Sequence, residues 1–286
     1  MPSKQSYGKI YFIGAGPGDP ELLTIKAAKI IAGADVIITD RLVSEAIITT
    51  YAKSDVIIIP VGKQAGKQTS ATQKEINELL VQFAAAYKKV VRLKGGDISL
   101  YSNILDELLT ANKYAISYEI VPGITAVSGA SAYTGVPLTA RGYADSVRIL
   151  TYYKNSLIKS EEWKELAGFT DTLVFYMSAD TLPDVVHELI AHGANTATPL
   201  LIIEQATTPN QHVHYYTLEE FNNKEVHETF ISPSLVIIGK VCSLYKEFAW
   251  LSNNNQRDHY FTPLRDYPEL IELINEFQNI QHVSRA

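Results

Sequence analysis

Charged and glycine-bearing turns follow five successive apolar runs of the sequence. In chain order these turns are Gly14–Pro20, Asp40-Arg41, Gly62-Lys63, Lys94–Asp97 and Pro122–Thr125. Open α/β sheets bind their ligands beside the carboxyl ends of the strands, where such turns meet. A carboxylate placed there can accept a proton, and cations can orient an anionic ligand. The sequence therefore predicts a ligand cleft at one edge of a sheet.

The first of these turns, Gly14-Ala15-Gly16-Pro17-Gly18-Asp19-Pro20, separates an apolar run from a helical pattern. Its glycines let the backbone approach a ligand, and the following helix offers free N–H groups. The dinucleotide fingerprint needs a third glycine where this chain has Asp19, and Pro17 and Pro20 stiffen the turn. No Gly-Lys-Ser/Thr follows, as a P-loop would require. A nucleotide-binding oxidoreductase is therefore disfavoured.

The segments that must position these turns alternate between short apolar runs and helical patterns. Strands are expected at Lys9–Ile13, Val36–Thr39, Val56–Val61, Val90–Leu93 and Ser117–Val121. Helices are expected at Glu21–Ala32, Ser44–Tyr51, Thr72–Tyr87, Asn103–Thr110 and Ile124–Tyr133, the third after a capping box at Ser70–Gln73. This alternation predicts an α/β fold with a mostly parallel sheet and right-handed crossovers. Because the apolar runs are continuous, helices are expected on both faces of the sheet.

The second half of the chain has a more mixed pattern, which predicts a separate domain after Gly142. Strands are expected at Val147–Tyr152, Thr172–Met177, Pro199–Glu204, Val213–Thr217 and Leu235–Ile238. Helices are expected at Leu182–His192 and Cys242–Leu251, and the polar segment Lys154–Gly168 is expected to be partly helical. Only the loop Gln205–His212 separates two of the strands, which favours antiparallel pairing and a mixed sheet. We therefore expect an N-terminal α/β domain at 1–142, a mixed α/β domain at 143–251 and a C-terminal extension at 252–286.

The composition excludes several functional classes. The chain of 286 residues carries 25 basic and 31 acidic residues, a net charge of −6, so a nucleic-acid partner is not expected. Cys242, its one cysteine, cannot form an internal disulfide and is expected to be buried. His212 and His214 share one strand face, but without a third ligand nearby a solvent-facing strand is favoured over a metal site. With no secretory signal or membrane-spanning pattern, the expectation is a cytoplasmic enzyme or binding protein without a membrane partner.

Taken together and in order, these turns resemble the tetrapyrrole methylases, and within that family most closely the uroporphyrinogen-III C-methyltransferases. The matching segments are Gly14–Thr24, Asp40–Ser44, Val61–Lys63, Arg92–Asp97, Val121–Ala126, Pro137–Thr139, Tyr143–Ser146, Tyr176-Met177, Glu204–Gln211 and Ser232–Leu235. The resemblance extends from about Lys9 to about Trp250. No single motif is specific for this family, but the order and spacing of all the motifs together are.

The resemblance implies two α/β domains with S-adenosylmethionine in a cleft between them, and a homodimer. It implies two successive C-methylations of uroporphyrinogen III, through precorrin-1 to precorrin-2, in sirohaem or cobalamin synthesis, with S-adenosylhomocysteine as the other product. In the family's pattern, the residues matching Asp40 and Lys63 are the proton acceptor and donor. The implied cofactor contacts are Pro17, Gly95, Gly96, Asp97, Leu100, Thr125, Ala126, Met177 and Ala206.

The chemistry of this reaction agrees with the residues in the turns. Methyl transfer from a sulfonium is an in-line displacement that depends on positioning and desolvation, so no metal is expected. The substrate is a polycarboxylate, so cations should orient it. Besides Lys63, the cations expected on cleft-side loops are Arg41, Lys67, Lys94 and Arg141.

The segment after the fourth strand departs from the pattern of the uroporphyrinogen-III enzymes. They usually read Gly-Gly-Asp-Pro-Phe-Ile-Phe-Gly-Arg-Gly-Gly-Glu-Glu, whereas this chain lacks the proline and the Gly-Arg-Gly in Gly95–Glu107. The run Ser99-Leu100-Tyr101 is more similar to that of methylases acting on later corrinoids. Two alternatives therefore stand beside the main expectation: a precorrin methylase with a later substrate, and a non-catalytic cofactor-binding paralogue.

Overall fold

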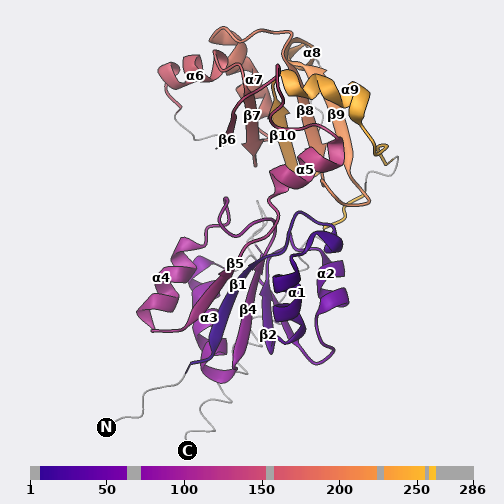
Figure 1. Ribbon diagram of the computed structural model, residues 1–286. Coiled ribbons are helices and arrows are strands. Elements are labelled where there is room, and N and C mark those ends of the chain that lie inside the picture. Colours follow the sequence, from indigo (N-terminus) through magenta and orange to yellow (C-terminus); the bar gives the residue numbers. More distant parts are fainter. Residues whose placement is uncertain (1–6, 63–71, 153–157, 224–228, 255–257, 262–286) are drawn as a thin grey trace, which may run out of the picture. The chain divides into compact units, whose positions relative to one another are not determined.

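The chain folds into two compact units, each built around its own sheet (Figure 1). The computed structural model describes residues 7–62, 72–152, 158–223, 229–254 and 258–261. The first unit contains the described residues up to Thr125 together with Phe261, and the second unit runs from Ala126 to Tyr260.

The division between the units lies before helix α5 (Ala126–Thr134), whereas the sequence places the boundary near Gly142. The reason is the packing of α5. Its Val127 and Ala130 belong to the same buried cluster as Val174 and Leu201 of the second sheet. The Val127 N–H also donates to the Tyr176 hydroxyl over 2.9 Å.

The sheet of the first unit is entirely parallel, as expected. Its strands are β1 (Lys9–Gly14), β2 (Val36–Thr39), β3 (Ile57–Pro60), β4 (Lys89–Lys94) and β5 (Tyr118–Val121), in the order β3-β2-β4-β1-β5. The α/β fold class and the position of every strand expected in this unit are confirmed. Continuous apolar runs form these strands because both faces of the sheet are buried.

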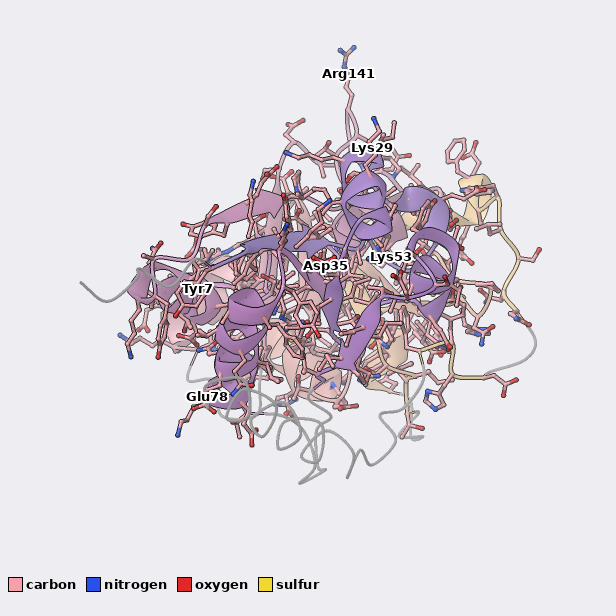
Figure 2. All side chains as sticks on the ribbon, turned by 90° about the horizontal axis from the view of Figure 1, so that it is seen from below. Tyr7, Lys29, Asp35, Lys53, Glu78 and Arg141 are labelled. Carbon is pink, nitrogen blue, oxygen red and sulfur yellow. The ribbon has the colours of Figure 1, made fainter. Side chains whose placement is uncertain are left out.

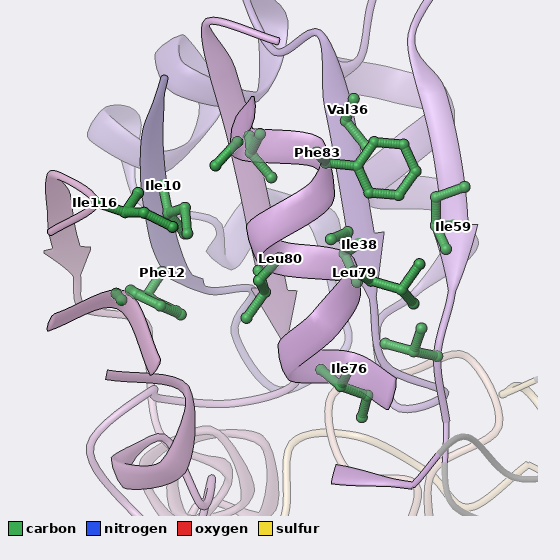
Figure 3. Packing of buried hydrophobic residues seen from close by; sticks show 14 of the residues in the cluster. Ile10, Phe12, Val36, Ile38, Ile59, Ile76, Leu79, Leu80, Phe83 and Ile116 are labelled. Carbon is green, nitrogen blue, oxygen red and sulfur yellow. The ribbon is translucent and has the colours of Figure 1, made fainter. Parts of the chain in front are cut away.

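Helices cover both faces of this sheet. They are η1 (Pro20–Leu22), α1 (Ile25–Ala32), α2 (Glu45–Tyr51), α3 (Gln73–Ala86) and α4 (Leu105–Lys113). On one face Ala27 and Ile31 of α1 and Ile47 of α2 pack against Ile37 and Leu93. The other face lies beneath α3 and α4, and Figure 3 shows Leu79, Leu80 and Phe83 of α3 against strand residues such as Ile10 and Ile38.

Two helix starts differ from the expectation. The helix expected from Glu21 is divided, because the Thr24 hydroxyl accepts a hydrogen bond from Ala27 N over 3.2 Å and so starts α1 anew. The capping box of α3 pairs Thr72 with Glu75, whereas Ser70 of the expected box lies outside the described residues. Both partners must fit the N-cap and N3 positions, which depend on where the first turn of the helix begins.

The order of the strands creates a topological switch point between β1 and β4. After β1 the chain continues into α1 on one face, and after β4 it continues into α4 on the other face. The two strands are adjacent and parallel, with Gly14 opposite Lys94. Ligands of open α/β sheets bind at such a point, outside the carboxyl ends of the strands.

The second unit has a mixed sheet, as expected. Its strands are β6 (Val147–Thr151), β7 (Thr172–Tyr176), β8 (Pro199–Glu204), β9 (His212–Thr217) and β10 (Ser234–Ile238), in the order β6-β7-β10-β8-β9. Only the pair β6–β7 is parallel among these, and β8 and β9 form the expected antiparallel pair.

Helices flank this second sheet as well. They are α5, α6 (Ser160–Ala167), α7 (Leu182–Ala191), α8 (Leu218–Asn222), η2 (Lys240–Leu244) and α9 (Tyr245–Phe248). Residues of α6, α7 and α8 pack on one face, whereas α5 and η2 pack on the other. Sequence reasoning missed α8, which begins with a capping box between Thr217 and Glu220. The helix expected at Cys242–Leu251 is instead the short pair η2 and α9, and Cys242 is buried as expected.

One expectation for the second sheet is wrong. His214 does not face solvent, because it is only 9% exposed and its Nε2 lies 3.3 Å from Glu204 Oε1. No cluster of three or more potential metal-ligating side chains occurs within the described ranges. In the same part of the chain, none of the helices combines the length and the apolar character needed to cross a membrane.

Candidate active site

The turns after β1, β4 and β5 are in direct contact through glycines. Gly16 and Gly96 exchange backbone hydrogen bonds of 3.0 and 2.7 Å, and both have a positive φ, of 78° and 70°. A Cβ added to Gly123 would lie 2.4 Å from the Gly96 oxygen, and one added to Gly14 would lie 2.7 Å from the same atom. These glycines are therefore needed for the close contact between the turns, independently of any ligand.

Asp97 holds two of these turns together. Its Oδ2 accepts a hydrogen bond of 2.9 Å from Gly123 N, and its Oδ1 accepts one of 2.9 Å from Ser99 N and another from the Ser99 hydroxyl. Burial alone would raise the pKa of Asp97, but these hydrogen bonds to the ionised form outweigh it and lower the pKa. Both carboxylate oxygens are thus used by the protein itself.

A pocket of about 250 Å³ opens beside the ends of β2 and β4. It is lined by polar and charged residues of three neighbouring turns and by a few apolar side chains. The lining residues are Asp40, Arg41, Leu42, Val61, Gly62, Gln73, Ile76, Arg92, Lys94, Gly95, Tyr101, Ser102 and Asn103.

Asp40 follows β2 and presents its carboxylate to this pocket. The side chain is 27% exposed, and its Oδ1 accepts a 2.5 Å hydrogen bond from Nη2 of Arg92. Nζ of Lys94 lies 3.7 Å from the other oxygen, Oδ2. The carboxylate is therefore fixed on its inner side by two cations and open on its outer side.

Arg41 contributes a positive charge that no carboxylate balances in the described part of the chain. Its Nε is buried without a hydrogen-bond partner there, and burial lowers the pKa of the guanidinium. A buried donor without a partner costs roughly 1–3 kcal/mol, and an anion in the pocket would remove that cost. The pocket is therefore suited to an anionic group.

The other predicted substrate cations differ in their positions. Lys94 is not on a loop, since it is the last residue of β4, and it is only 5% exposed. Arg141 lies in an exposed turn, and Figure 2 shows its side chain extending away from the ribbon. Lys63 and Lys67 lie outside the described residues. Of the predicted substrate cations in the described residues, the structure thus brings Arg41 and Lys94 together with Asp40.

Two predicted cofactor residues of the second unit lie at one edge of its sheet. Met177 follows β7, and Ala206 comes two residues after the end of β8. Both strands pair with β10, so Tyr176 lies opposite Leu235 and Glu204 opposite Ser234. Met177 is half exposed, with a φ of 54°.

Residues with a strained backbone lie at this edge of the second sheet, after β7 and β8. Gln205 and Thr207, on either side of Ala206, have φ values of 47° and 68°, and Met177 shares this left-handed conformation. Residues with side chains adopt this conformation at a cost of about 1–3 kcal/mol, and it concentrates at functional sites. Ala126, the remaining predicted cofactor residue of this unit, is the first residue of α5.

Sequence reasoning missed Arg92 and Glu107 as parts of the site. Arg92 is 1% exposed and Glu107 is fully buried, and Nε of Arg92 lies 3.2 Å from both oxygens of Glu107. Asp40 and Glu107 raise the pKa of Arg92 above its ordinary value, although burial opposes this. The available signal was a charged residue between the apolar residues Val91 and Leu93 of a buried strand.

Comparisons with known proteins agree with this fold. Residues 9–222 match the family model of the tetrapyrrole (corrin/porphyrin) methylases. A sirohaem synthase of Pseudoalteromonas translucida is 41% identical over 261 residues, which cover 91% of this chain and 54% of that protein. A sirohaem synthase of Acinetobacter baylyi is 43% identical over 85% of this chain and 53% of its own length. The chain thus spans about half the length of the curated relatives it matches.

Several solved structures match this chain over nearly their whole length. A uroporphyrin-III C-methyltransferase of Thermus thermophilus is 31% identical, with a TM-score of 0.69 over 83% of this chain and 94% of that one. The same enzyme bound to S-adenosyl homocysteine is 33% identical over 82% of this chain and 93% of that one, with a TM-score of 0.68. A cobalt precorrin-4 methyltransferase has a TM-score of 0.71 at 27% identity, over 82% of this chain and 95% of that one. The sequence motifs, the two sheets and these matches agree, and the chain belongs to the tetrapyrrole methylase family of S-adenosylmethionine-dependent methyltransferases.

Proposed function

We propose that the chain methylates two carbon atoms of uroporphyrinogen III and yields precorrin-2 through precorrin-1. The observation that carries the proposal is the pocket in which the Asp40 carboxylate lies beside Arg41. Uroporphyrinogen III combines ring N–H groups with many carboxylate side chains. A pocket that offers one proton acceptor and one unbalanced cation matches both features.

In this proposal Asp40 accepts the proton that a pyrrole N–H loses as its ring carbon is methylated. The reduced pyrrole is already electron-rich, so removal of this proton is the step that a nearby carboxylate assists. Arg41 binds one carboxylate side chain of the substrate and so orients the ring beside Asp40. Lys63, outside the described residues, is proposed as the proton donor, and Lys67 and Arg141 as further contacts of the carboxylates.

S-adenosylmethionine supplies the methyl group as an electrophilic sulfonium. The residues proposed to contact it in the first unit are Pro17, Gly95, Gly96, Asp97, Leu100 and Thr125, and those in the second are Ala126, Met177 and Ala206. The residues fit such a ligand, since Gly95 and Gly96 are partly exposed and Met177 is half exposed. The Thermus thermophilus enzyme bound to S-adenosyl homocysteine supports this choice of cofactor.

One incubation tests the proposal directly. Purified protein is mixed with uroporphyrinogen III and S-adenosylmethionine labelled in its methyl group, and the products are followed by mass spectrometry. Transfer of two labelled methyl groups to each tetrapyrrole is the expected result. Binding of the cofactor without transfer would support a non-catalytic paralogue, and absence of binding would refute the assigned cofactor.

A methylase of a later corrinoid is the second candidate. The observation that favours it is that Tyr101 and Asn103, in the segment that departs from the uroporphyrinogen-III pattern, line the pocket. Both have a left-handed backbone, with φ values of 53° and 54°. The similarity to a cobalt precorrin-4 methyltransferase points the same way. Parallel incubations with precorrin-2 and later intermediates distinguish the two candidates by which substrate gains label.

The resemblance to the family also supports two proposals about the state of the protein, a homodimer and a cytoplasmic location. Light scattering coupled to size-exclusion chromatography tests the dimer, and a mass of one chain would refute it.

A further inference from the structure

Four charged side chains close a ring beneath the pocket. The ring consists of Asp40 after β2, Arg92 and Lys94 on β4, and Glu107 on α4. Arg92 donates to Asp40 over 2.5 Å and to Glu107 over 3.2 Å. Nζ of Lys94 lies 3.0 Å from Glu107 and 3.7 Å from Asp40. Each carboxylate therefore contacts both cations, and the four formal charges sum to zero.

The ring is buried except at Asp40. The side chains of Arg92, Glu107 and Lys94 are 1%, 0% and 6% exposed, whereas that of Asp40 is 27% exposed. Although Arg92 and Lys94 border the pocket, they offer almost no surface for a substrate carboxylate. Whatever they contribute to a reaction must therefore reach the substrate through Asp40.

Arg92 is itself fixed on every side. Its Nη1 donates to the backbone oxygens of Ile38 and Leu93, each over 3.3 Å, while Nε faces Glu107. The remaining nitrogen, Nη2, is thereby directed at Oδ1 of Asp40. Oδ2 of Asp40 has no hydrogen-bond donor among the described residues, since Lys94 at 3.7 Å is beyond hydrogen-bond distance. One oxygen is anchored and the other is available to accept a proton.

We propose that Arg92, Lys94 and Glu107 are positioning residues that hold the Asp40 carboxylate and set its basicity. The proposal rests on the proposed role of Asp40 as proton acceptor. Within the ring, the carboxylate of Glu107 balances part of the positive charge of Arg92 and Lys94. Without its charge, Arg92 and Lys94 would both act on Asp40 alone and make it a weaker base. A buried network of this kind contributes little net stability compared with apolar residues, which makes a positioning role the better account of it.

The variant Glu107→Gln tests the balance of charge, with Glu165→Gln as the matched control. Glu165 forms an ion pair of similar length with Arg148, at 2.9 Å, but its side chain is 66% exposed. We expect Glu107→Gln to lower kcat by up to about tenfold and to move the acid limb of the pH–rate profile to lower pH. The KM for the tetrapyrrole and the affinity for S-adenosylmethionine should stay unchanged. Equal losses of kcat, affinity and thermal stability would show a merely structural role and overturn the proposal.

A second measurement does not depend on activity. The carboxyl ¹³C signal of Asp40 is identified in Asp-labelled protein as the one that Asp40→Asn removes, and is titrated in the wild type and in Glu107→Gln. The midpoint should move to lower pH in Glu107→Gln and stay unchanged in Glu165→Gln. An unchanged midpoint in Glu107→Gln would refute the proposal even if the wild type methylates uroporphyrinogen III. A shifted midpoint without any methylation would uphold the ring and refute only the proposed function.

The double variant Arg92→Met/Glu107→Leu covers the case in which Glu107→Gln does not fold. Replacing a buried ion pair by apolar residues of similar size is often neutral for stability, and Lys94, which loses its contact with Glu107, keeps Asp40 as its carboxylate partner. The variant leaves Asp40 with Lys94 alone and without its anchored oxygen. We expect wild-type affinity for S-adenosylmethionine and a kcat reduced by about tenfold or more. Wild-type kcat in this variant would overturn the proposal.

Discussion

Gly16 and Gly96 exchange two backbone hydrogen bonds across the switch point between β1 and β4. The parallel ladder between these strands ends at Gly14 and Lys94, and the contact beyond it is an isolated antiparallel bridge between the two turns. It fixes the spacing between the first glycine-rich turn and the turn proposed to hold the cofactor. The rigidity of this edge is therefore built into the backbone, and side chains in the pocket are arranged around it.

Substitution of Asp40 should separate turnover from cofactor affinity. We expect Asp40→Asn to lower kcat by about 10²–10⁴-fold, the usual contribution of a general base. The affinity for S-adenosylmethionine, measured by calorimetry, should be retained because Asn keeps the shape of the side chain. Asp55→Asn is the control, since Asp55 forms an exposed ion pair with Lys53. Wild-type turnover in Asp40→Asn would exclude Asp40 as the base.

Substitution of Gly123 should disturb the contact between the turns. A methyl group there would lie 2.4 Å from the Gly96 oxygen, so Gly123→Ala should destabilise the protein by about 1–3 kcal/mol and weaken cofactor binding. Gly168→Ala is the matched control, because its added Cβ would have no neighbour closer than 3.4 Å and its φ is −82°. Chemical denaturation measures the first effect and calorimetry the second. Equal stability of the two variants would contradict the crowding argument.

The pH dependence of stability should reveal Asp97. Folding lowers the pKa of Asp97, so the ionised side chain stabilises the protein at pH values above its ordinary pKa of 3.8. This contribution is lost as the pH falls through the lower pKa of the folded state. Asp97→Asn should therefore lower the free energy of unfolding at pH 6 by about 1–3 kcal/mol. The difference from the wild type should shrink below about pH 4. A difference that stays constant from pH 6 to pH 3 would show that ionisation of Asp97 is irrelevant.

Cys242 should be inert in the folded protein. Burial raises the pKa of its thiol to about 12, and the side chain is fully enclosed. Since the thiolate is the reactive form, a disulfide reagent at pH 8 should not modify the native protein and should modify one thiol after denaturation. Rapid reaction of the native protein would mean that η2 opens readily.

Sequence reasoning located the strand ends because both faces of the first sheet are buried, which makes every strand a continuous apolar run. It also brought Asp40, Arg41 and Lys94 to one edge, since parallel strands end together. The sequence could not predict the ring of Asp40, Arg92, Lys94 and Glu107. Glu107 lies fifteen residues after Arg92 and on a helix, and the pairing depends on how α4 packs on the sheet.

Other features depended on tertiary packing in the same way. The burial of His214 follows from its contact with Glu204 on the neighbouring strand. The division before α5 follows from the packing of that helix on the second sheet, whereas the change in composition comes later, near Gly142. The pattern of apolar residues along a strand predicts which faces of the sheet are buried. It does not predict which distant helix covers each face.

The insertion of β4 between β2 and β1 has a consequence for how the first unit folds. Until β4 has been synthesised, β1 and β2 have no shared neighbour, because in the finished sheet they do not pair with each other. A nascent chain that ends after β3 therefore exposes the inner edges of two apolar strands. The unit should close only when β4 enters, in a single late event that joins all four strands and brings Asp40, Arg92 and Lys94 together.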